Sequence, residues 1–220
     1  MRVIAIDGPA GAGKSTIARA LARRLGLEYL DTGAMYRAIT FGALQHGLSL
    51  DDAAAIGAFA READLEVGER GVTINGHDAT VAIRTPEITA AVSKVAANSE
   101  VRAEMRARQQ HWAAQRGGGV IEGRDIGSVV FPDAELKLYL TASPRTRAER
   151  RVAEAGGDVD EIEAAIAARD HSDLSRADSP LTMADGSIVV DTTGSSIEEV
   201  LERIEALMSK RGDREGCAER

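Results

Sequence analysis

The sequence predicts an α/β domain in which a parallel β-sheet is covered by helices on both faces. Three observations favour this class. Short apolar strands alternate with helices along most of the chain. A glycine-rich loop joins the first expected strand to the first expected helix. An Asn75-Gly76 pair, a strong signal for a tight β-hairpin, marks a small antiparallel insert that interrupts the alternation.

The individual elements follow from hydrophobic periodicity and from turn residues. Apolar runs predict strands of the main sheet at 2–6, 28–30, 120–121, 136–140 and 187–190. Helical spacing predicts helices at 14–25, 34–45, 51–61, 86–97, 100–115, 144–154, 159–170 and 196–208. Short strands of the insert are expected at 64–67, 71–74 and 79–83. The polar segment 210–220 is expected to be disordered, and the alternation does not specify the order of the strands.

Composition limits the classes of protein that fit. The chain has 220 residues, of which 44% are hydrophobic, and this is enough for one compact domain with a core. No run of 18 apolar residues occurs, so no membrane span is expected. The net charge of −8 argues against a nucleic-acid partner. Cys217 is the single cysteine, so no intramolecular disulfide can form and a cytoplasmic location is expected.

The glycine-rich loop has a specific chemistry. Residues 8–15 read GPAGAGKS and fit the pattern G-x-x-x-x-G-K-[ST] between a strand and a helix. The backbone N–H groups of such a loop converge on phosphate oxygens, and the helix N-terminus adds a favourable dipole. Lys14 is expected to reach the β- and γ-phosphates of ATP, and Ser15 to hold Mg²⁺. The expected ATP-binding residues are Gly8, Pro9, Ala10, Gly11, Ala12, Gly13, Lys14, Ser15 and Thr16.

The loop alone does not say what is done with the nucleoside triphosphate. A GTPase would normally carry an N-K-x-D motif that reads guanine. The two asparagines of the chain, Asn75 and Asn98, are followed by glycine and serine, so this motif is missing. A kinase that acts on a nucleotide or another small molecule becomes the leading class.

Three further motifs carry a more specific resemblance. They are DTGAMYR at 31–37, EGRDIG at 122–127, and Arg169-Asp170-x-x-Asp173-x-x-Arg176. Together with the phosphate loop and the insert at 64–97, they resemble the bacterial cytidylate kinases over about residues 2–209. The sequence departs from that family at Glu122, where the family usually has aspartate.

The resemblance implies a fold and its division. It implies the nucleoside-monophosphate kinase fold with a phosphate loop, a five-stranded parallel sheet, an acceptor-binding lobe that contains the antiparallel insert, and a mobile lid. Residues 1–209 would form one domain. Its core would comprise 1–39, 116–143 and 171–209, its acceptor lobe 40–115, and its lid 145–170. The resemblance also implies a monomer.

The resemblance further implies transfer of the γ-phosphoryl group of ATP to CMP or dCMP. The acceptor is a phosphate with a second pKa near 6, so it is already nucleophilic at neutral pH and needs no general base. Bringing two polyanions together instead requires Mg²⁺ and arginines, whose guanidinium groups match phosphate oxygens in pairs. Cytosine offers one amino donor and two acceptors, so its reader needs an acceptor and one or two donors.

The roles implied by the resemblance fall on motif residues. The expected acceptor-binding residues are Thr32, Arg37, Ser93, Arg102, Arg124, Asp125, Arg169, Asp173 and Arg176. Among them Arg37, Arg124 and Arg176 would clamp the phosphate. Ser93, Arg102 and Asp125 would read the base, while Arg169 and Asp173, four apart on one helix face, would bind the ribose. Lys14, Arg124, Arg147 and Arg151 are the expected catalytic residues, and Arg150 is a further candidate in the lid.

Two other functions remain open on the residues alone. One is a hydroxyl kinase of the shikimate or gluconate type, which would need a base that Asp31 could provide. The other is a regulatory module that binds ATP without transferring its phosphoryl group. The sequence does not reveal the preference between CMP and dCMP, the use of UMP, or the preference between ATP and GTP.

Overall fold

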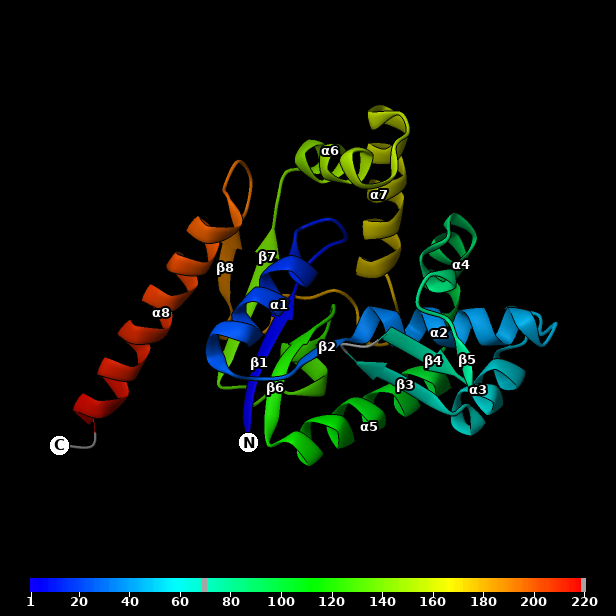
Figure 1. Ribbon diagram of the computed structural model, residues 1–220, viewed down its shortest axis with the longest axis horizontal. Coiled ribbons are helices and arrows are strands. Elements are labelled where there is room, and N and C mark those ends of the chain that lie inside the picture. The colour runs from blue at the N-terminus through cyan, green and yellow to red at the C-terminus, as the bar shows by residue number, and fades with distance from the viewer. Residues whose placement is uncertain (69–70, 219–220) are drawn as a thin grey trace.

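The fold is built on a five-stranded parallel sheet. The computed structural model describes the backbone of residues 1–68 and 71–218 and the side chains within that range up to residue 208. The strands are β1 (Arg2–Asp7), β2 (Tyr29–Asp31), β6 (Gly118–Glu122), β7 (Leu136–Thr141) and β8 (Ile188–Asp191). They lie in the order β2-β6-β1-β7-β8, and every neighbouring pair is parallel (Figure 1). The predicted parallel sheet is confirmed.

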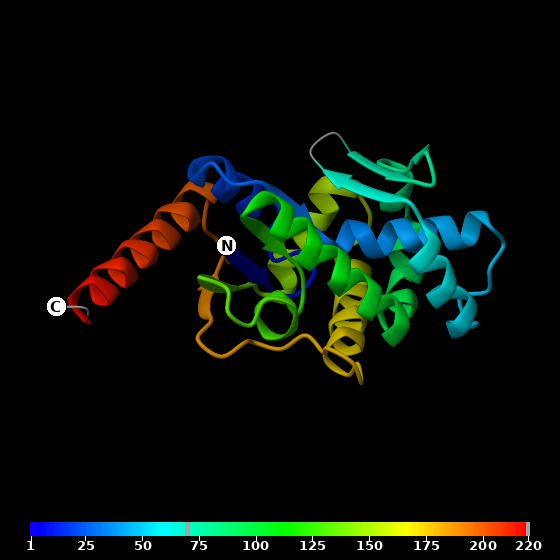
Figure 2. The same ribbon diagram turned by 90° about the horizontal axis from the view of Figure 1, so that it is seen from below.

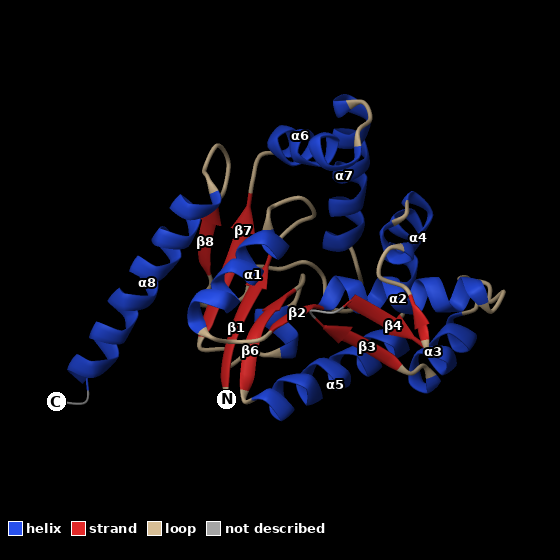
Figure 3. Ribbon diagram, viewed as in Figure 1, coloured by secondary structure: helices blue, strands red, loops and turns tan. Residues whose placement is uncertain are grey.

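Alternate residues of the central strand face opposite layers of helices. Val3 and Ala5 of β1 pack with α2 (Thr32–Gln45) and α5 (Ser99–Arg116). Ile4 and Ile6 pack with α1 (Lys14–Leu25) and α8 (Ile197–Ala218) on the other face. Figure 3 shows helices, drawn in blue, flanking the red strands of this sheet. Because both faces of β1 are covered, its sequence is apolar throughout its interior, as is typical of parallel strands.

The insert is a second, antiparallel sheet of three strands in the order β3-β4-β5. Its strands are β3 (Leu65–Gly68), β4 (Gly71–Ile74) and β5 (His77–Asp78). Ile74 pairs with His77 across a two-residue turn in which Asn75 and Gly76 have φ values of 50° and 77°. Such a turn needs positive φ at both positions, which is why asparagine and glycine occur there. The predicted hairpin is therefore confirmed.

The predicted third strand of the insert was misplaced. Pairing resumes immediately after the two-residue turn, so the strand occupies His77–Asp78 and not 79–83. Asp78 Oδ1 then accepts a hydrogen bond from the backbone N–H of Thr80 at 2.9 Å, which bends the chain out of the sheet. The following residues form the 3₁₀ turn η1 (Ala82–Arg84), which leads into α4 (Pro86–Ala96).

The remaining helices begin close to their predicted positions, and the last of them continues past its predicted end at residue 170. These are α3 (Ala53–Glu62), α6 (Pro144–Ala155) and α7 (Val159–Leu174). Helix α6 begins where Ser143 accepts a hydrogen bond from the N–H of Thr146 at 3.1 Å, with proline at its first position. One turn of π-helix, η2 (Ile126–Val130), follows β6 and was not predicted. Figure 2 places α8 and the three-stranded sheet at opposite ends of the molecule.

The end of the chain differs from its prediction. Helix α8 was expected to end at residue 208, with a disordered segment at 210–220, but the described backbone continues the helix to Ala218. The added stretch has no proline, so each further residue can add a helical hydrogen bond. Residues 219–220 lie outside the described range. None of the described helices is long and apolar enough to cross a membrane. The division into core, lobe and lid stays a prediction.

Candidate active site

The candidate site is a cleft at the carboxyl ends of the parallel strands. It has a volume of about 1410 Å³ and is lined by the phosphate loop, the ends of β2 and β6, and residues of α4, α5, α6 and α7. Loops that follow parallel strands all emerge at this edge, which is where open α/β sheets bind their ligands. The sequence-predicted residues therefore converge although they are spread over most of the chain.

The phosphate loop has the backbone conformation that its glycines were expected to allow. Gly8, Gly11 and Gly13 have φ values of 143°, 78° and 83°. A Cβ atom at Gly8 would lie 2.0 Å from the carbonyl oxygen of Leu140, so a side chain is excluded there. The loop passes directly into the N-terminus of α1. Its N–H groups and the helix dipole are thus available to an anion in the cleft.

Lys14 is buried at the base of this loop. Its Nζ donates a hydrogen bond to the carbonyl oxygen of Pro9 at 2.8 Å. Burial, followed by the positive charge of Arg124, lowers the pKa of Lys14. A phosphate group bound in the loop would supply the missing negative charge and favour the protonated amine.

The residues beside Lys14 fit a magnesium ion held mainly by a nucleotide. Ser15 is exposed to the cleft. The buried carboxylate of Glu122 accepts hydrogen bonds from the hydroxyl groups of Ser15 and Tyr29. Burial, and then the nearby Asp31, raise the pKa of Glu122. Mg²⁺ prefers oxygen ligands and is usually held by one or two protein groups together with phosphate oxygens and waters. The donor set is of this kind.

Three arginines, Arg124, Arg169 and Arg176, lie around the buried carboxylate of Asp173, and Arg37 lies near Arg124 and Arg169 in the same cleft. Asp173 accepts hydrogen bonds from Arg124 Nε and from an Arg176 terminal nitrogen, both at 2.8 Å. Burial would raise the pKa of Asp173, but these two arginines outweigh it and lower that pKa. Arg37 and Arg169 line the same cleft. Asp173, together with Asp31 beside Arg37, cannot balance the charge of four guanidinium groups.

The excess of positive charge is visible in unpaired hydrogen-bond donors. Within the described residues, the buried Nε atoms of Arg37, Arg169 and Arg176 have no hydrogen-bond acceptor. Burial, and then the charges of Arg124 and Arg37, lower the pKa of Arg169 to about 10. Buried donors without acceptors are costly, so the cluster favours an anion with several oxygens. The predicted phosphate-clamp residues are brought together here.

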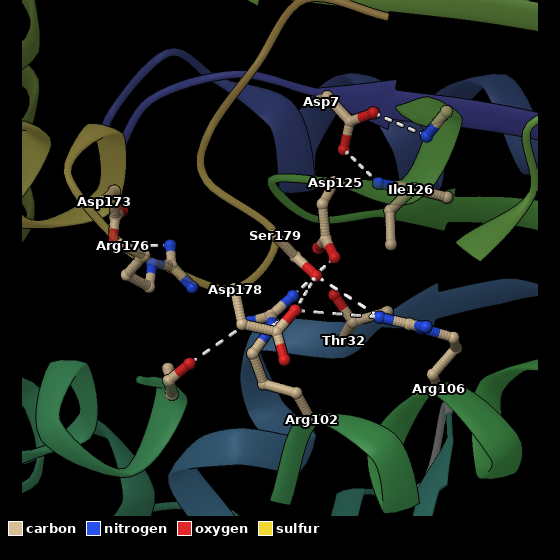
Figure 4. Close-up of polar contacts among 12 residues, drawn as sticks. Asp7, Thr32, Arg102, Arg106, Asp125, Ile126, Asp173, Arg176, Asp178 and Ser179 are labelled. Atoms are coloured by element: carbon tan, nitrogen blue, oxygen red, sulfur yellow. Dashed lines mark hydrogen bonds and ion pairs between the residues drawn. The ribbon is translucent and has the colours of Figure 1, made fainter. Parts of the chain in front are cut away.

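The predicted base-reading residues lie at one end of the cleft. Arg102 is 2% exposed and forms an ion pair with the buried Asp125 (Figure 4). The Arg102 guanidinium lies 5.6 Å from the ring centroid of Tyr36, close enough for a cation–π interaction. Ser93 of α4 lines the cleft as well. The hydroxyl of Thr32 donates to the carbonyl oxygen of Glu122 at 2.6 Å, so Thr32 supports the wall of the cleft.

The three arginines of α6 occupy different places. Arg147 is buried and donates to the carbonyl oxygen of Ala10 at 3.0 Å, so it braces the phosphate loop from behind. Arg150 donates to the hydroxyl and the carbonyl oxygen of Thr192 at 3.0 and 2.7 Å. Arg150 and Arg151 line the cleft, whereas Arg147 is not among the lining residues. A catalytic role for Arg147 and Arg151 remains a prediction.

Sequence reasoning missed Asp7 and Arg84. Asp7 is 3% exposed, and its carboxylate accepts from the N–H groups of Ile126 and Gly127 at 2.8 and 2.7 Å (Figure 4). It thereby holds the turn that carries Asp125. A charged residue at the end of an apolar strand was the available signal. Arg84 lines the cleft 3.9 Å from the carboxylate of Asp31, and no local pattern distinguishes it from other arginines.

The burial of Asp7 predicts a pH dependence of stability. Burial raises the pKa of Asp7 from 3.8 to about 6. The stabilising contribution of an acid with a raised folded pKa is complete below pH 3.8 and is lost as the pH rises through about 6. Asp7→Asn does not titrate. The free energy of unfolding of the native protein should therefore fall relative to that of Asp7→Asn, by about 2 kcal/mol between pH 4 and 7.

Urea unfolding of both proteins at the two pH values measures this difference. Asp133→Asn, which changes an exposed aspartate and keeps Asp7, serves as the control, and its free energy of unfolding should fall between the two pH values by nearly the same amount as that of the native protein. A native-minus-variant difference that stays constant or rises with pH would contradict the assigned environment of Asp7.

A glycine-rich phosphate loop that heads a five-stranded parallel sheet and faces an arginine cluster defines a protein of the P-loop kinase fold. The structure resembles a gluconokinase from Sinorhizobium meliloti 1021 with a TM-score of 0.56 and 13% identity, covering 100% of this chain and 98% of that chain. At this identity the likeness concerns the fold alone. The sequence model of the cytidylate kinase family matches residues 4–210, and the chain belongs to that family.

Two relatives that match nearly all of this chain differ from each other in length. A cytidylate kinase of Desulfitobacterium hafniense strain Y51 is 48% identical over 216 residues, which is 94% of this chain and 93% of that protein. A bifunctional pantoate ligase/cytidylate kinase of Prochlorococcus marinus strain MIT 9303 is 49% identical over 213 residues. That match covers 92% of this chain, but the chain spans only 43% of the bifunctional protein.

Proposed function

We propose that this protein transfers the γ-phosphoryl group of ATP to CMP or dCMP. The observation that carries the proposal is the cluster of buried arginines in the same cleft as the phosphate loop, because the Nε atoms of Arg37, Arg169 and Arg176 find no acceptor in the part of the chain that the structure describes. A cleft with two separate sites for phosphate fits a donor and an acceptor that are both phosphorylated. Family membership and the relative from Desulfitobacterium hafniense support cytidine as the acceptor nucleoside.

In the proposed mechanism the chain positions two polyanions and neutralises their charge. Lys14 and the loop N–H groups bind the β- and γ-phosphates, and Arg37, Arg124 and Arg176 hold the acceptor phosphate. Ser15 would hold Mg²⁺ and Glu122 would orient Ser15, and the ion, when bound, would neutralise charge on the donor phosphates. No proton has to be removed from the acceptor phosphate at neutral pH, so no general base is assigned.

The acceptor base lies, in this proposal, beside Ser93, Arg102 and Asp125. The Asp125 carboxylate can accept from the N4 amino group of cytosine or hold Arg102 in place, and Ser93 supplies a hydroxyl. Arg169 and Asp173 bind the ribose. We further propose that the protein works as a monomer in the cytoplasm. Asp31 already caps α2 by accepting from the N–H of Ala34 at 2.9 Å, which disfavours its use as the base of a hydroxyl kinase.

Base selection tests the proposed acceptor. Uracil would place a carbonyl where the cytosine amino group should face a carboxylate, and an opposed buried polar pair costs roughly 1–3 kcal/mol. The native protein should therefore prefer CMP to UMP by at least about tenfold in kcat/KM. Ser93→Ala and Asp125→Ala should lose CMP activity more than UMP activity. A coupled assay of ADP release measures both.

The same assay with AMP, GMP, shikimate and gluconate separates the proposal from other functions. ADP release stimulated by shikimate or gluconate and not by CMP would identify a hydroxyl kinase. ATP binding without release stimulated by any acceptor would identify a regulatory module. Equal proportional losses for CMP and UMP in both variants would mean that Ser93 and Asp125 support the cleft without reading the base.

A further inference from the structure

The loop that follows α7 contains a backbone conformation that an ordinary residue seldom adopts. Ser179 has a φ of 49° and is 7% exposed. The left-handed conformation is unfavourable for a residue with a Cβ atom, and where it persists in a buried position the surrounding contacts hold it. The backbone N–H of Leu181 donates to the carbonyl oxygen of Asp173 at 2.8 Å and closes the loop against α7. Ser179 is thus fixed near the cleft.

The polar contacts of this loop reach the side chains that are expected to read the acceptor base (Figure 4). The Ser179 hydroxyl donates to Asp178 Oδ1 at 2.6 Å and accepts from Arg106 at 3.3 Å. The same Asp178 oxygen lies 3.8 Å from Arg102 Nε and 3.9 Å from a terminal nitrogen of Arg106. Asp178 therefore faces two arginines of α5, one of which is the predicted base reader.

The Arg102 guanidinium has one side that does not contact Asp125 and that faces a second carboxylate. One terminal nitrogen pairs with Asp125, and the other donates to the carbonyl oxygen of Ala96 at 3.2 Å. Its buried Nε has no hydrogen-bond acceptor within the described residues, and Asp178 is the carboxylate that it faces. The orientation of the guanidinium plane thus depends on Asp178. This residue belongs neither to the helix that carries Arg102 nor to the turn that carries Asp125.

We propose that Asp178 and Ser179 are positioning residues that set the Arg102 guanidinium for the acceptor base. This rests on the proposed function, because base reading by Arg102 is part of it. The left-handed Ser179 places its hydroxyl so that Asp178 is held toward α5. Arg176, two residues before Asp178, binds Asp173 in the phosphate clamp. One short loop therefore serves both the phosphate and the base of the acceptor.

The charge of Asp178 agrees with this role. The hydrogen bond from Ser179 lowers the pKa of Asp178, and the charges of Arg102 and Arg106 lower it further. The carboxylate is therefore ionised at neutral pH and attracts both arginines. Neutral asparagine has almost the same shape but lacks this charge, so Asp178→Asn removes the interaction with little change in volume.

A double-mutant cycle tests the action of Asp178 through Arg102. Calorimetry with CMP as the ligand should show that Asp178→Asn raises the Kd about 5- to 20-fold in the native background. In the Arg102→Ala background the same substitution should change the Kd less than about twofold, because its target is gone. ATP affinity should be unchanged in both backgrounds. Glu104→Gln is the matched control, since it breaks a partly buried ion pair with Arg108 on the same helix.

The Ser179 variants separate positioning from stability. Ser179→Gly removes the hydroxyl and relieves the backbone, so it should raise the Kd for CMP while leaving Tm at or above that of the native protein. Ser179→Ala removes the hydroxyl and keeps the unfavourable conformation, so it should raise the Kd by a similar factor at a lower Tm. If the Kd for CMP rose only in the variant whose Tm fell, the effect would be one of stability and the proposal would be overturned.

Two outcomes of the double-mutant cycle would contradict the proposal. An unchanged Kd in Asp178→Asn, or an equal rise in both backgrounds, would show that Asp178 does not act through Arg102. The proposed function fails differently: the native protein would then neither bind CMP nor prefer it to UMP. If the native protein binds CMP and Asp178→Asn leaves the Kd for CMP unchanged, only the positioning role is overturned.

Discussion

Lys14→Met is expected to lower kcat by about 10³-fold or more while leaving a folded protein. Lys14 is the cation that the phosphate loop places at its base, with Nζ held by the carbonyl oxygen of Pro9 at 2.8 Å. Charge that develops between the β- and γ-phosphates during transfer would lose this stabilisation, whereas methionine preserves most of the buried side-chain volume. The rate of ADP release at saturating ATP and CMP measures the effect.

The control for this substitution is Lys137→Met. Lys137 also lies on the parallel sheet, but its amine donates to the carbonyl oxygen of Asp185 at 3.2 Å, away from the cleft. Turnover in that variant should stay within about twofold of the native rate, as is usual for surface changes. Near-native turnover in a folded Lys14→Met would refute the assignment of the phosphate loop.

Arg124→Ala is expected to lower kcat/KM about 10²-fold for CMP and for UMP alike. Arg124 lies in the cleft between Lys14 and Asp173, and its Nε donates to Asp173 at 2.8 Å. A guanidinium that binds the acceptor phosphate cannot sense the base, so the ratio of the two kcat/KM values should not change. Its loss also leaves Asp173 with one fewer partner, which adds to the effect.

Arg108→Ala provides the comparison for Arg124→Ala. Arg108 is similarly buried and forms an ion pair with Glu104 at 2.6 Å, but it contacts the carbonyl oxygens of Ala60 and Arg61 and not the cleft. The Arg108→Ala substitution should lower Tm and leave kcat/KM for CMP and UMP close to the native values. A loss in Arg124→Ala that is large for CMP and small for UMP would place Arg124 at the base and not at the phosphate.

Local sequence determined the elements that depend on residues close together in the chain. The phosphate loop needs glycine at positions of positive φ, and Gly11 and Gly13 adopt them. The Asn75-Gly76 turn needs two such positions in succession, so two residues suffice to predict it. The bounds of α1 follow from the loop before it and from Gly26, which ends the helix in the left-handed conformation.

The acceptor site was predictable only in part. The motifs identified Arg124, Asp125 and Asp173 through resemblance, and the structure places all three along one cleft. Their pairings were not predictable, because Arg124 and Asp173 are 49 residues apart and no periodicity links them. The third strand of the insert was misplaced for a related reason, since Ala79 and Ile83 reach the core without a strand, and Val81 between them is exposed.

The sequence by itself determined that this chain forms a parallel α/β fold with a phosphate loop, because backbone conformation and hydrophobic periodicity act over a few residues. Only the tertiary structure decided the strand order, the hydrogen bonds of Asp7 to Ile126 and Gly127, and the contact of Asp178 with Arg102. Each of these joins groups far apart in the chain. Burial and the need to pair buried charges select them, and both arise only when the helices have packed on the sheet.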